Sequence, residues 1–222
     1  MNWLAHAWPQ VLDLLGDHIV IAVPAVLLSI VIAVPIGLFA HRRPRVGGAL
    51  LGVTTLLYAV PSLALMIIIP ALFGVPLRSN ATVIIALTFY GTALLVRTAA
   101  DAFHAVDDAV REAARGIGYS PASIFWKVDL PRAVPLLVAG IRVVAVSTVG
   151  LVTIGALVGV AGLGTLFTDG FQRGIIAEVA TGLLLTVALA LVLDGLCLVA
   201  GRLLAPWSAP RRTSRVRAEA TA

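Results

Sequence analysis

Apolar residues run almost without interruption through most of this chain, and polar positions gather in a few short segments. A helix needs roughly 20 apolar residues to cross the hydrocarbon core of a bilayer. Five runs meet that length: residues 19–40, 47–73, 81–100, 134–160 and 178–200. The pattern predicts an all-α integral membrane domain over residues 19–200, with about five transmembrane helices.

Four prolines lie inside the first two runs: Pro24, Pro35, Pro61 and Pro70. Helices in lipid tolerate proline when neighbouring helices satisfy the carbonyl groups that it leaves without a partner. We therefore expect each proline to bend its helix, and a hinge in a moving gate is the alternative.

Composition agrees with a membrane protein. Of the 222 residues, 60% are hydrophobic and 12% are charged, which is outside the range of ordinary soluble domains. The net charge of +5 would suggest nucleic acid as the partner of a soluble protein. In a membrane protein basic residues report orientation instead, so we expect no nucleic-acid partner. The single cysteine, Cys197, excludes an internal disulfide, and four scattered histidines give no reason to expect a metal site.

Basic residues are distributed unevenly between the polar segments. Thirteen Lys and Arg residues lie in residues 41–45, 97–133 and 201–222, whereas the opposite side carries Arg78 and Arg173. By the positive-inside rule, the three basic segments are cytoplasmic. Five spans then put the N-terminus outside and the C-terminus inside the plasma (inner) membrane.

Three further segments lie outside the predicted spans or between them. Residues 1–18 contain Trp3 and Trp8 but no Lys or Arg, and we expect an external helix along the interface, where tryptophan is enriched. Residues 201–222 form a basic cytoplasmic tail. Its arginines could contact membrane lipid, but a solvated tail without fixed structure is the simpler interpretation. The glycine-rich residues 159–174 are too short to span and predict an outer-side turn or a partial re-entrant segment.

The loop over residues 101–133 carries start and stop signals for two helices. Asp107 and Asp108 are suited to cap a first helix, and Gly118 is suited to stand just past its end. Within that helix, Asp107 and Arg111 have the i,i+4 spacing of an ion pair.

A second, short helix follows in the same loop. Ser120 as N-cap and Pro121 as the first helical residue form a strong start signal. Pro131 disfavours a helical conformation at the residue before it, so this helix should end near Asp129. Its apolar residues are consecutive: Ile124, Phe125 and Trp126. Three successive residues cannot share one face of a helix, so some apolar surface is left for a partner in the cytosol.

Seven positions in this loop match a known motif in register: Glu112, Ala113, Ala114, Gly118, Val128, Leu130 and Pro131. The stretch resembles the signature loop of ABC-importer permeases, in which EAA is followed by a spaced glycine and a terminal Leu-Pro. Val128 stands where isoleucine is commoner. The resemblance implies that the short helix, with Phe125 and Trp126, docks in a groove of a cytoplasmic ABC ATPase subunit and transmits its motion.

Three other stretches extend the resemblance: residues 58–74 (YAVPSLALMIIIPALFG), 139–142 (AGIR) and 159–164 (GVAGLG). They are similar to the permeases of osmoprotectant uptake, which carry glycine betaine, carnitine and choline. The resemblance implies the type I ABC-importer permease core. It also implies separate ATPase subunits, a second permease copy or paralogue, and a separate external substrate-binding protein. It implies no cofactor.

The chain lacks the motifs of a catalytic subunit. No GxxxxGK[ST] loop is available to hold ATP phosphates, and neither HExxH nor GxSxG occurs. We therefore predict the non-catalytic permease subunit of an ATP-driven importer. A permease for another small solute such as methionine is the nearest alternative. A self-sufficient secondary transporter would favour paired ionisable residues at mid-membrane, and an intramembrane enzyme would need a nucleophile and base with readable spacing.

Two pairs of residues inside the predicted spans are candidate functional positions. Tyr58 and Tyr90 could face a translocation path, since aromatic faces bind quaternary ammonium groups, but the sequence favours core packing for them. Arg142 and Asp194 lie roughly 12–15 Å from the cytoplasmic edge on antiparallel helices. This equal depth predicts an intramembrane ion pair. The alternative is that Arg142 snorkels to the interface and Asp194 faces a wet cavity separately.

Overall fold

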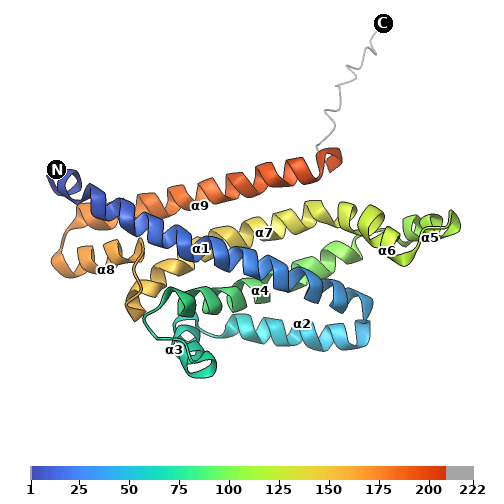
Figure 1. Ribbon diagram of the computed structural model, residues 1–222, viewed down its shortest axis with the longest axis horizontal. Coiled ribbons are helices and arrows are strands. Elements are labelled where there is room, and N and C mark those ends of the chain that lie inside the picture. Colours follow the sequence, from blue (N-terminus) through green and yellow to red (C-terminus); the bar gives the residue numbers. More distant parts are fainter. Residues whose placement is uncertain (1, 209–222) are drawn as a thin grey trace, which may run out of the picture.

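The computed structural model describes residues 2–208, and every element within that range is helical (Figure 1). The α-helices are α1 (Asn2–Arg42), α2 (Pro44–Ala59), α3 (Ser62–Phe73), α4 (Asn80–His104), α5 (Asp108–Gly116), α6 (Pro121–Ile124), α7 (Leu130–Val152), α8 (Gly164–Arg173) and α9 (Ile176–Leu204). Three short turns complete the order: the π-helical η1 (Phe125–Asp129) and the 3₁₀-helical η2 (Thr153–Val158) and η3 (Pro206–Ser208). The predicted all-helical class is confirmed.

Helix α4 joins most of the bundle, since it contacts α1, α2, α3 and α7. Its close approach to α1 depends on a small residue, because a Cβ at Gly91 would collide with the side chain of Ser29. The largest apolar core gathers buried side chains of α1, α3 and α4, such as Ile21, Met66 and Leu87. Helix α9 packs on α7 and α8 at the edge of the bundle and keeps most of its surface exposed.

Within residues 2–208, four helical segments are long and apolar enough to cross a membrane: Ala7–Arg42, Asn80–His104, Pro121–Val158 and Ile176–Leu204. A fifth span requires α2 and α3 together, but these helices are bent by 107° where they meet. Proline disfavours a helical conformation at the preceding residue, and Val60, before Pro61, takes extended angles with φ −66° and ψ 129°. The span predicted over residues 47–73 is therefore broken far more sharply than the expected bend.

The separate helix expected over residues 1–18 is not formed, because α1 continues through that boundary (Figure 1). Val11, Leu14, His18 and Ile21 are all buried at spacings of three or four residues. One stripe therefore crosses residue 18 and packs this part of α1 onto the rest of the molecule. A helix of 41 residues is about 60 Å long, so its ends extend beyond the hydrocarbon core.

The expected stop near Asp129 is also absent, and the helix continues from Pro121 to Val158. In the π-helical turn η1, the N–H of Leu130 donates to the carbonyl of Phe125. Pro131 lies just after this turn, near the start of α7, and it cannot donate a backbone hydrogen bond to the preceding turn. The wider turn thus absorbs the proline without breaking the helix.

The remaining predicted segments differ in part from the structure. Residues 159–174 form a turn followed by α8, which packs against α9. Helix α9 reaches Leu204, so the first residues of the expected 201–222 tail are helical. Residues 206–208 of that tail form η3, and residues 209–222 lie outside the described residues.

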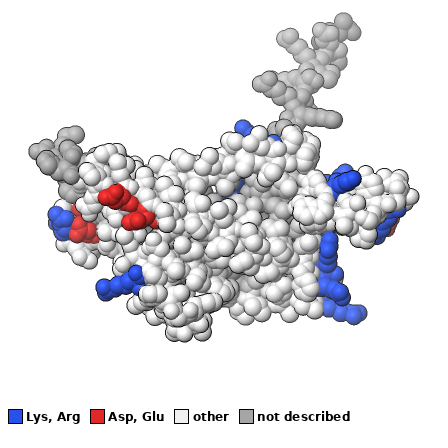
Figure 2. Space-filling model, viewed as in Figure 1, with Lys and Arg blue, Asp and Glu red and all other residues white. Residues whose placement is uncertain are grey.

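Charged side chains gather toward the two ends of the long axis in Figure 2, and the surface between them on this face carries very few. Many exposed residues on the long helices are large and apolar, including Val31, Leu184 and Leu191. A broad apolar belt between two charged ends is what a helical protein in a bilayer requires. The arrangement supports a multi-pass membrane protein.

Candidate functional site

Local hydrogen bonds build the loop between α4 and α7. Asp107 caps α5, since its Oδ1 accepts a backbone N–H two residues on at 2.9 Å. The helix ends in a Schellman motif, in which the N–H of Tyr119 donates to Ala114 and that of Gly118 donates to Arg115, both at 3.0 Å. Gly118 has φ +90°, so the prediction that it stands just past the helix end is confirmed.

The start of the short helix α6 also follows its sequence signal. Ser120 Oγ accepts the N–H of Ser123 at 3.2 Å, and Pro121 is the first helical residue. Both start signals are confirmed. The N-cap of α6 therefore follows the glycine turn directly, and this arrangement sets the direction of α6 relative to α5.

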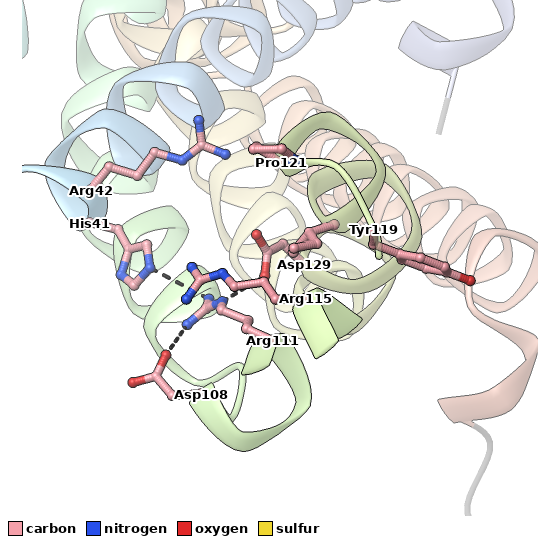
Figure 3. Close-up of a pocket in the computed structure, with 9 residues that line it drawn as sticks. His41, Arg42, Asp108, Arg111, Arg115, Tyr119, Pro121 and Asp129 are labelled. Carbon is pink, nitrogen blue, oxygen red and sulfur yellow. Dashed lines mark hydrogen bonds and ion pairs between the residues drawn. The ribbon is translucent and has the colours of Figure 1, made fainter. Parts of the chain in front are cut away.

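A buried arginine fastens this loop to the helices beneath it (Figure 3). Arg111 Nε donates to Asp129 Oδ1 at 2.7 Å, and Nη1 donates to Asp108 Oδ1 at 2.7 Å. Its Nη2 reaches the carbonyl of Phe103 in α4, also at 2.7 Å. The predicted partner Asp107 is occupied as the cap of α5, so Asp108 and Asp129 take its place. The cluster forms one wall of a cavity of about 470 Å³.

The hydrogen bonds around Arg111 favour its charged form. Burial acts to lower the pKa of Arg111, but the hydrogen bonds to Asp129 and Asp108 outweigh it and raise the pKa. The hydrogen bond from Arg111 in turn lowers the pKa of Asp108. Sequence reasoning missed this cluster, although an acid at position 129, between apolar neighbours on a helix, was an available signal.

The seven motif residues divide between surface and interior. Glu112, Ala113 and Gly118 are exposed, Ala114 and Val128 are buried, and Leu130 and Pro131 are half-buried. The buried members form a small apolar cluster with Val106 and Ile124 that joins α5 to α6. The motif thus contributes both the packing of the loop and part of its exposed face.

The three successive apolar residues of the short helix face in different directions. Ile124 is buried, and Phe125 is half-buried with the guanidinium of Arg42 5.5 Å from its ring centroid. Trp126 is 65% exposed. The prediction that part of this apolar surface stays exposed is confirmed.

Tyr58 and Tyr90 meet between α2 and α4, with ring centroids 5.1 Å apart. They line a cavity of about 240 Å³ whose wall also includes Ser147 and Thr148 of α7. Tyr90 packs partly against the core, whereas Tyr58 is 46% exposed. The structure thus places one tyrosine partly in the core and both beside a cavity.

Arg142 of α7 and Asp194 of α9 also come together. Arg142 Nε donates to Asp194 Oδ1 and Nη2 donates to Oδ2, each at 2.7 Å. A two-pronged contact of this kind fixes orientation as well as distance. The two side chains are 37% and 26% exposed, so the pair lies at a surface of the isolated chain.

His18 links three parts of the molecule, a role that no sequence pattern revealed. Its buried ring places Nε2 3.0 Å from the carbonyl of Val149, and Nδ1 accepts the N–H of Leu163 at 3.2 Å. Because Nδ1 accepts, the neutral ring carries its proton on Nε2 and donates it to Val149. The ring ties α1 to α7 and to the segment before α8. Both partners are backbone groups, 131 and 145 residues away in sequence.

Comparison with known proteins places these features in a family. Residues 19–212 match the model of the binding-protein-dependent transport system inner membrane component. The choline transport system permease protein OpuBB of Bacillus subtilis is 31% identical over 190 residues, which cover 86% of each chain. The osmoprotectant import permease protein OsmW of Salmonella typhimurium is 34% identical over 187 residues, 81% of this chain and 85% of its own.

A solved structure agrees in fold. An inward-facing conformation of the MetNI methionine ABC transporter covers 87% of this chain and 95% of its own, with a TM-score of 0.76 at 21% identity. At that identity the likeness shows the fold alone, that of a type I ABC-importer permease. The family match and the helical membrane fold agree, and the chain belongs to the binding-protein-dependent transport system inner membrane components as a multi-pass permease subunit of an ABC importer.

Proposed function

We propose that this permease imports quaternary-ammonium osmoprotectants, the class that includes choline, glycine betaine and carnitine. The proposal rests on 31% and 34% identity, over 86% and 81% of the chain, to permeases named for choline and for osmoprotectants. A permease of Bacillus subtilis named for glycine betaine, carnitine and choline, OpuCB, is 28% identical over 206 residues. The methionine transporter matches in fold only, so methionine is the weaker alternative.

The cavity beside Tyr58 and Tyr90 suits such solutes chemically. A trimethylammonium group has no N–H to donate and is attracted to the faces of aromatic rings. The hydroxyls of Ser147 and Thr148 add polar surface without a fixed charge. A permease needs weak attraction along its path, since a solute held tightly would not leave.

The loop between α4 and α7 is the proposed contact for the ATPase. Glu112, Ala113 and Trp126 are exposed there, while the Arg111 cluster holds the loop on the carbonyl of Phe103. The helix that begins at Pro121 continues without a break into α7. Because α7 carries residues of the tyrosine cavity, a movement imposed on α6 by the ATPase would reach the solute path through one continuous helix.

The proposed importer contains several further subunits. Cytoplasmic ATPase subunits supply energy, an external binding protein delivers the solute, and a second permease copy or paralogue completes the path. The loop of α5 and α6 faces the cytoplasm and the N-terminus faces outside. Cysteines at Gln10 and Ala105, both exposed, should react with a membrane-impermeant reagent from opposite sides in a Cys197→Ala background. Reaction from the same side would overturn the orientation.

The substrate class is tested by uptake into vesicles that contain the complete importer. Labelled choline, glycine betaine, carnitine and methionine are each offered with and without ATP, and unlabelled methionine is also tested as a competitor of the quaternary ammonium solutes. We expect ATP-dependent uptake of at least one quaternary ammonium, with no competition by methionine. ATP-dependent uptake of methionine without uptake of any quaternary ammonium would overturn the proposal.

A further inference from the structure

The Arg142–Asp194 pair lies on an otherwise apolar face. The two side chains remain 37% and 26% exposed although each is bonded to the other. Their neighbours Val143 and Val146 are 55% and 42% exposed. Paired charges that border exposed valines need an explanation in a membrane helix.

Depth makes direct contact with lipid unfavourable for this pair. Arg142 lies about 18 Å along α7 from Leu130, and Asp194 lies about 15 Å along α9 from Leu204. Both distances correspond to about half the thickness of a hydrocarbon core. Ionisable residues at that depth face the bundle interior or a water-filled cavity. The exposed side of the pair therefore borders water or protein in the assembled importer.

The shape of the surface favours water and solute at this position. A hollow of about 410 Å³ is lined by the ion pair and by Ala139, Val143, Val146 and Ser147. Ser147 also lines the cavity of about 240 Å³ beside Tyr58 and Tyr90. One side chain is thus shared by the aromatic cavity and the charged hollow, which makes them neighbours along α7.

We propose that the two cavities form one solute path and that the Arg142–Asp194 pair is its charged wall, complementary to a zwitterion. This inference rests on the proposed function. Glycine betaine and carnitine carry a trimethylammonium and a carboxylate, whereas choline carries only the cation. Asp194 attracts the trimethylammonium, and Arg142 donates to the solute carboxylate.

The pair can act on a solute without separating. Arg142 uses Nε and Nη2 toward Asp194, so Nη1 is not used in this contact. A guanidinium has five N–H donors, and each carboxylate oxygen can accept more than one hydrogen bond. A zwitterion aligned along the pair would therefore meet opposite charges at both of its ends while the helices α7 and α9 stay joined.

The path is tested by chemical accessibility in the complete importer, in a Cys197→Ala background. Val146→Cys lies in the hollow. Val192→Cys is the matched control, because Val192 is 57% exposed, lies about 3 Å along α9 from Asp194 and faces another way. We expect a charged water-soluble thiol reagent to react with Val146→Cys at least about tenfold faster than with the control, since thiols react only where water reaches them. Equal reactivity of the two cysteines would overturn the path.

Charge complementarity is tested by neutralising the pair with Arg142→Gln and Asp194→Asn together. We expect the ratio of glycine betaine uptake to choline uptake to fall about tenfold or more, the effect of losing one charge-assisted hydrogen bond. The same double change at the exposed pair Arg173 and Asp169 is the control and should leave the ratio unchanged. An unchanged ratio in the Arg142 and Asp194 variant would overturn the charged wall. If the unmodified importer carries no quaternary ammonium, the proposed function fails alone, and the thiol reaction still decides whether the pair borders water.

Discussion

Two arginine–aspartate contacts in this molecule have the same length and very different surroundings. Arg111 meets Asp129 at 2.7 Å in the loop, with side chains 11% and 12% exposed. Arg142 meets Asp194 at 2.7 Å between two long helices, with side chains 37% and 26% exposed. The distance therefore does not distinguish the two contacts. They differ in the other contacts that each arginine makes.

Arg111 is surrounded by acceptors, whereas Arg142 donates to one carboxylate. Arg111 donates to Asp129, to Asp108 and to a backbone carbonyl of α4. A cation saturated in this way has little left to offer a ligand, so its contribution is to hold α5 against the helices below. An arginine that keeps part of its surface exposed in the membrane region can still bind a solute. The comparison supports a structural role for the first contact and the proposed solute contact for the second.

The largest expected effect comes from breaking the saturated contact. Asp129→Ala leaves Arg111 without its buried partner, and breaking a buried ion pair typically costs about 3–5 kcal/mol. We expect a lower unfolding temperature of the purified permease and weak ATPase association. Asp108→Ala is the matched control, because the Asp108 side chain is 86% exposed and an exposed pair is worth about 0–1 kcal/mol. Equal losses in both variants would contradict the assignment of Asp129 as the structural partner.

The second prediction concerns Trp126, and it separates ATPase docking from the stability of the same loop. Trp126 is 65% exposed, so Trp126→Ala should leave the unfolding temperature almost unchanged. If its ring is a main contact for the ATPase, affinity should fall roughly 30-fold, equivalent to about 2 kcal/mol. Titration of detergent-purified permease with the ATPase measures this. Ile124→Ala, at a buried neighbour, should instead lower stability, and unaltered ATPase binding by Trp126→Ala would remove the proposed docking contact.

A smaller effect should follow from the glycine turn between α5 and α6. Gly118 has φ +90°, and a Cβ added there would meet no other atom within 4 Å, so only the backbone conformation opposes a side chain at this position. Gly118→Val should cost about 1 kcal/mol or more and redirect α6. We expect ATP-driven uptake to fall while the protein still inserts. Gly116 also has open space and lacks a positive φ, so Gly116→Ala is the control and should transport normally.

Local features of the loop were predictable because each depends on neighbours in sequence. The cap at Asp107, the turn at Gly118 and the start at Ser120 follow from hydrogen bonds that close within a few residues. The partner of Arg111 was not predictable in the same way. Spacing favours Asp107, but that carboxylate is already used as a cap, and Asp129 reaches Arg111 only through the fold.

In the membrane region, a feature could be predicted when it followed from counting residues along a helix. The meeting of Arg142 and Asp194 follows from equal depth on antiparallel helices. The different outcomes at two prolines do not follow from such a count. The chain bends sharply at Pro61, whereas the helix continues past Pro131. The contacts of His18 with two distant backbone groups had no sequence signal at all.

The smallest expected effect concerns pH and the exposed partner of Arg111. The hydrogen bond from Arg111 lowers the pKa of Asp108 below its ordinary value. A carboxyl group with a lowered pKa in the folded state stabilises that state above its unfolded pKa, near 3.9, and the stabilisation is lost as pH falls through the folded pKa. The unfolding temperature of the unmodified permease should therefore exceed that of Asp108→Asn by a small constant amount above about pH 5. The difference should close below about pH 4. A difference that widened toward low pH would mean that Asp108 does not bond to Arg111 as a carboxylate. Asp129 would then be the one carboxylate among the described residues that Arg111 bonds.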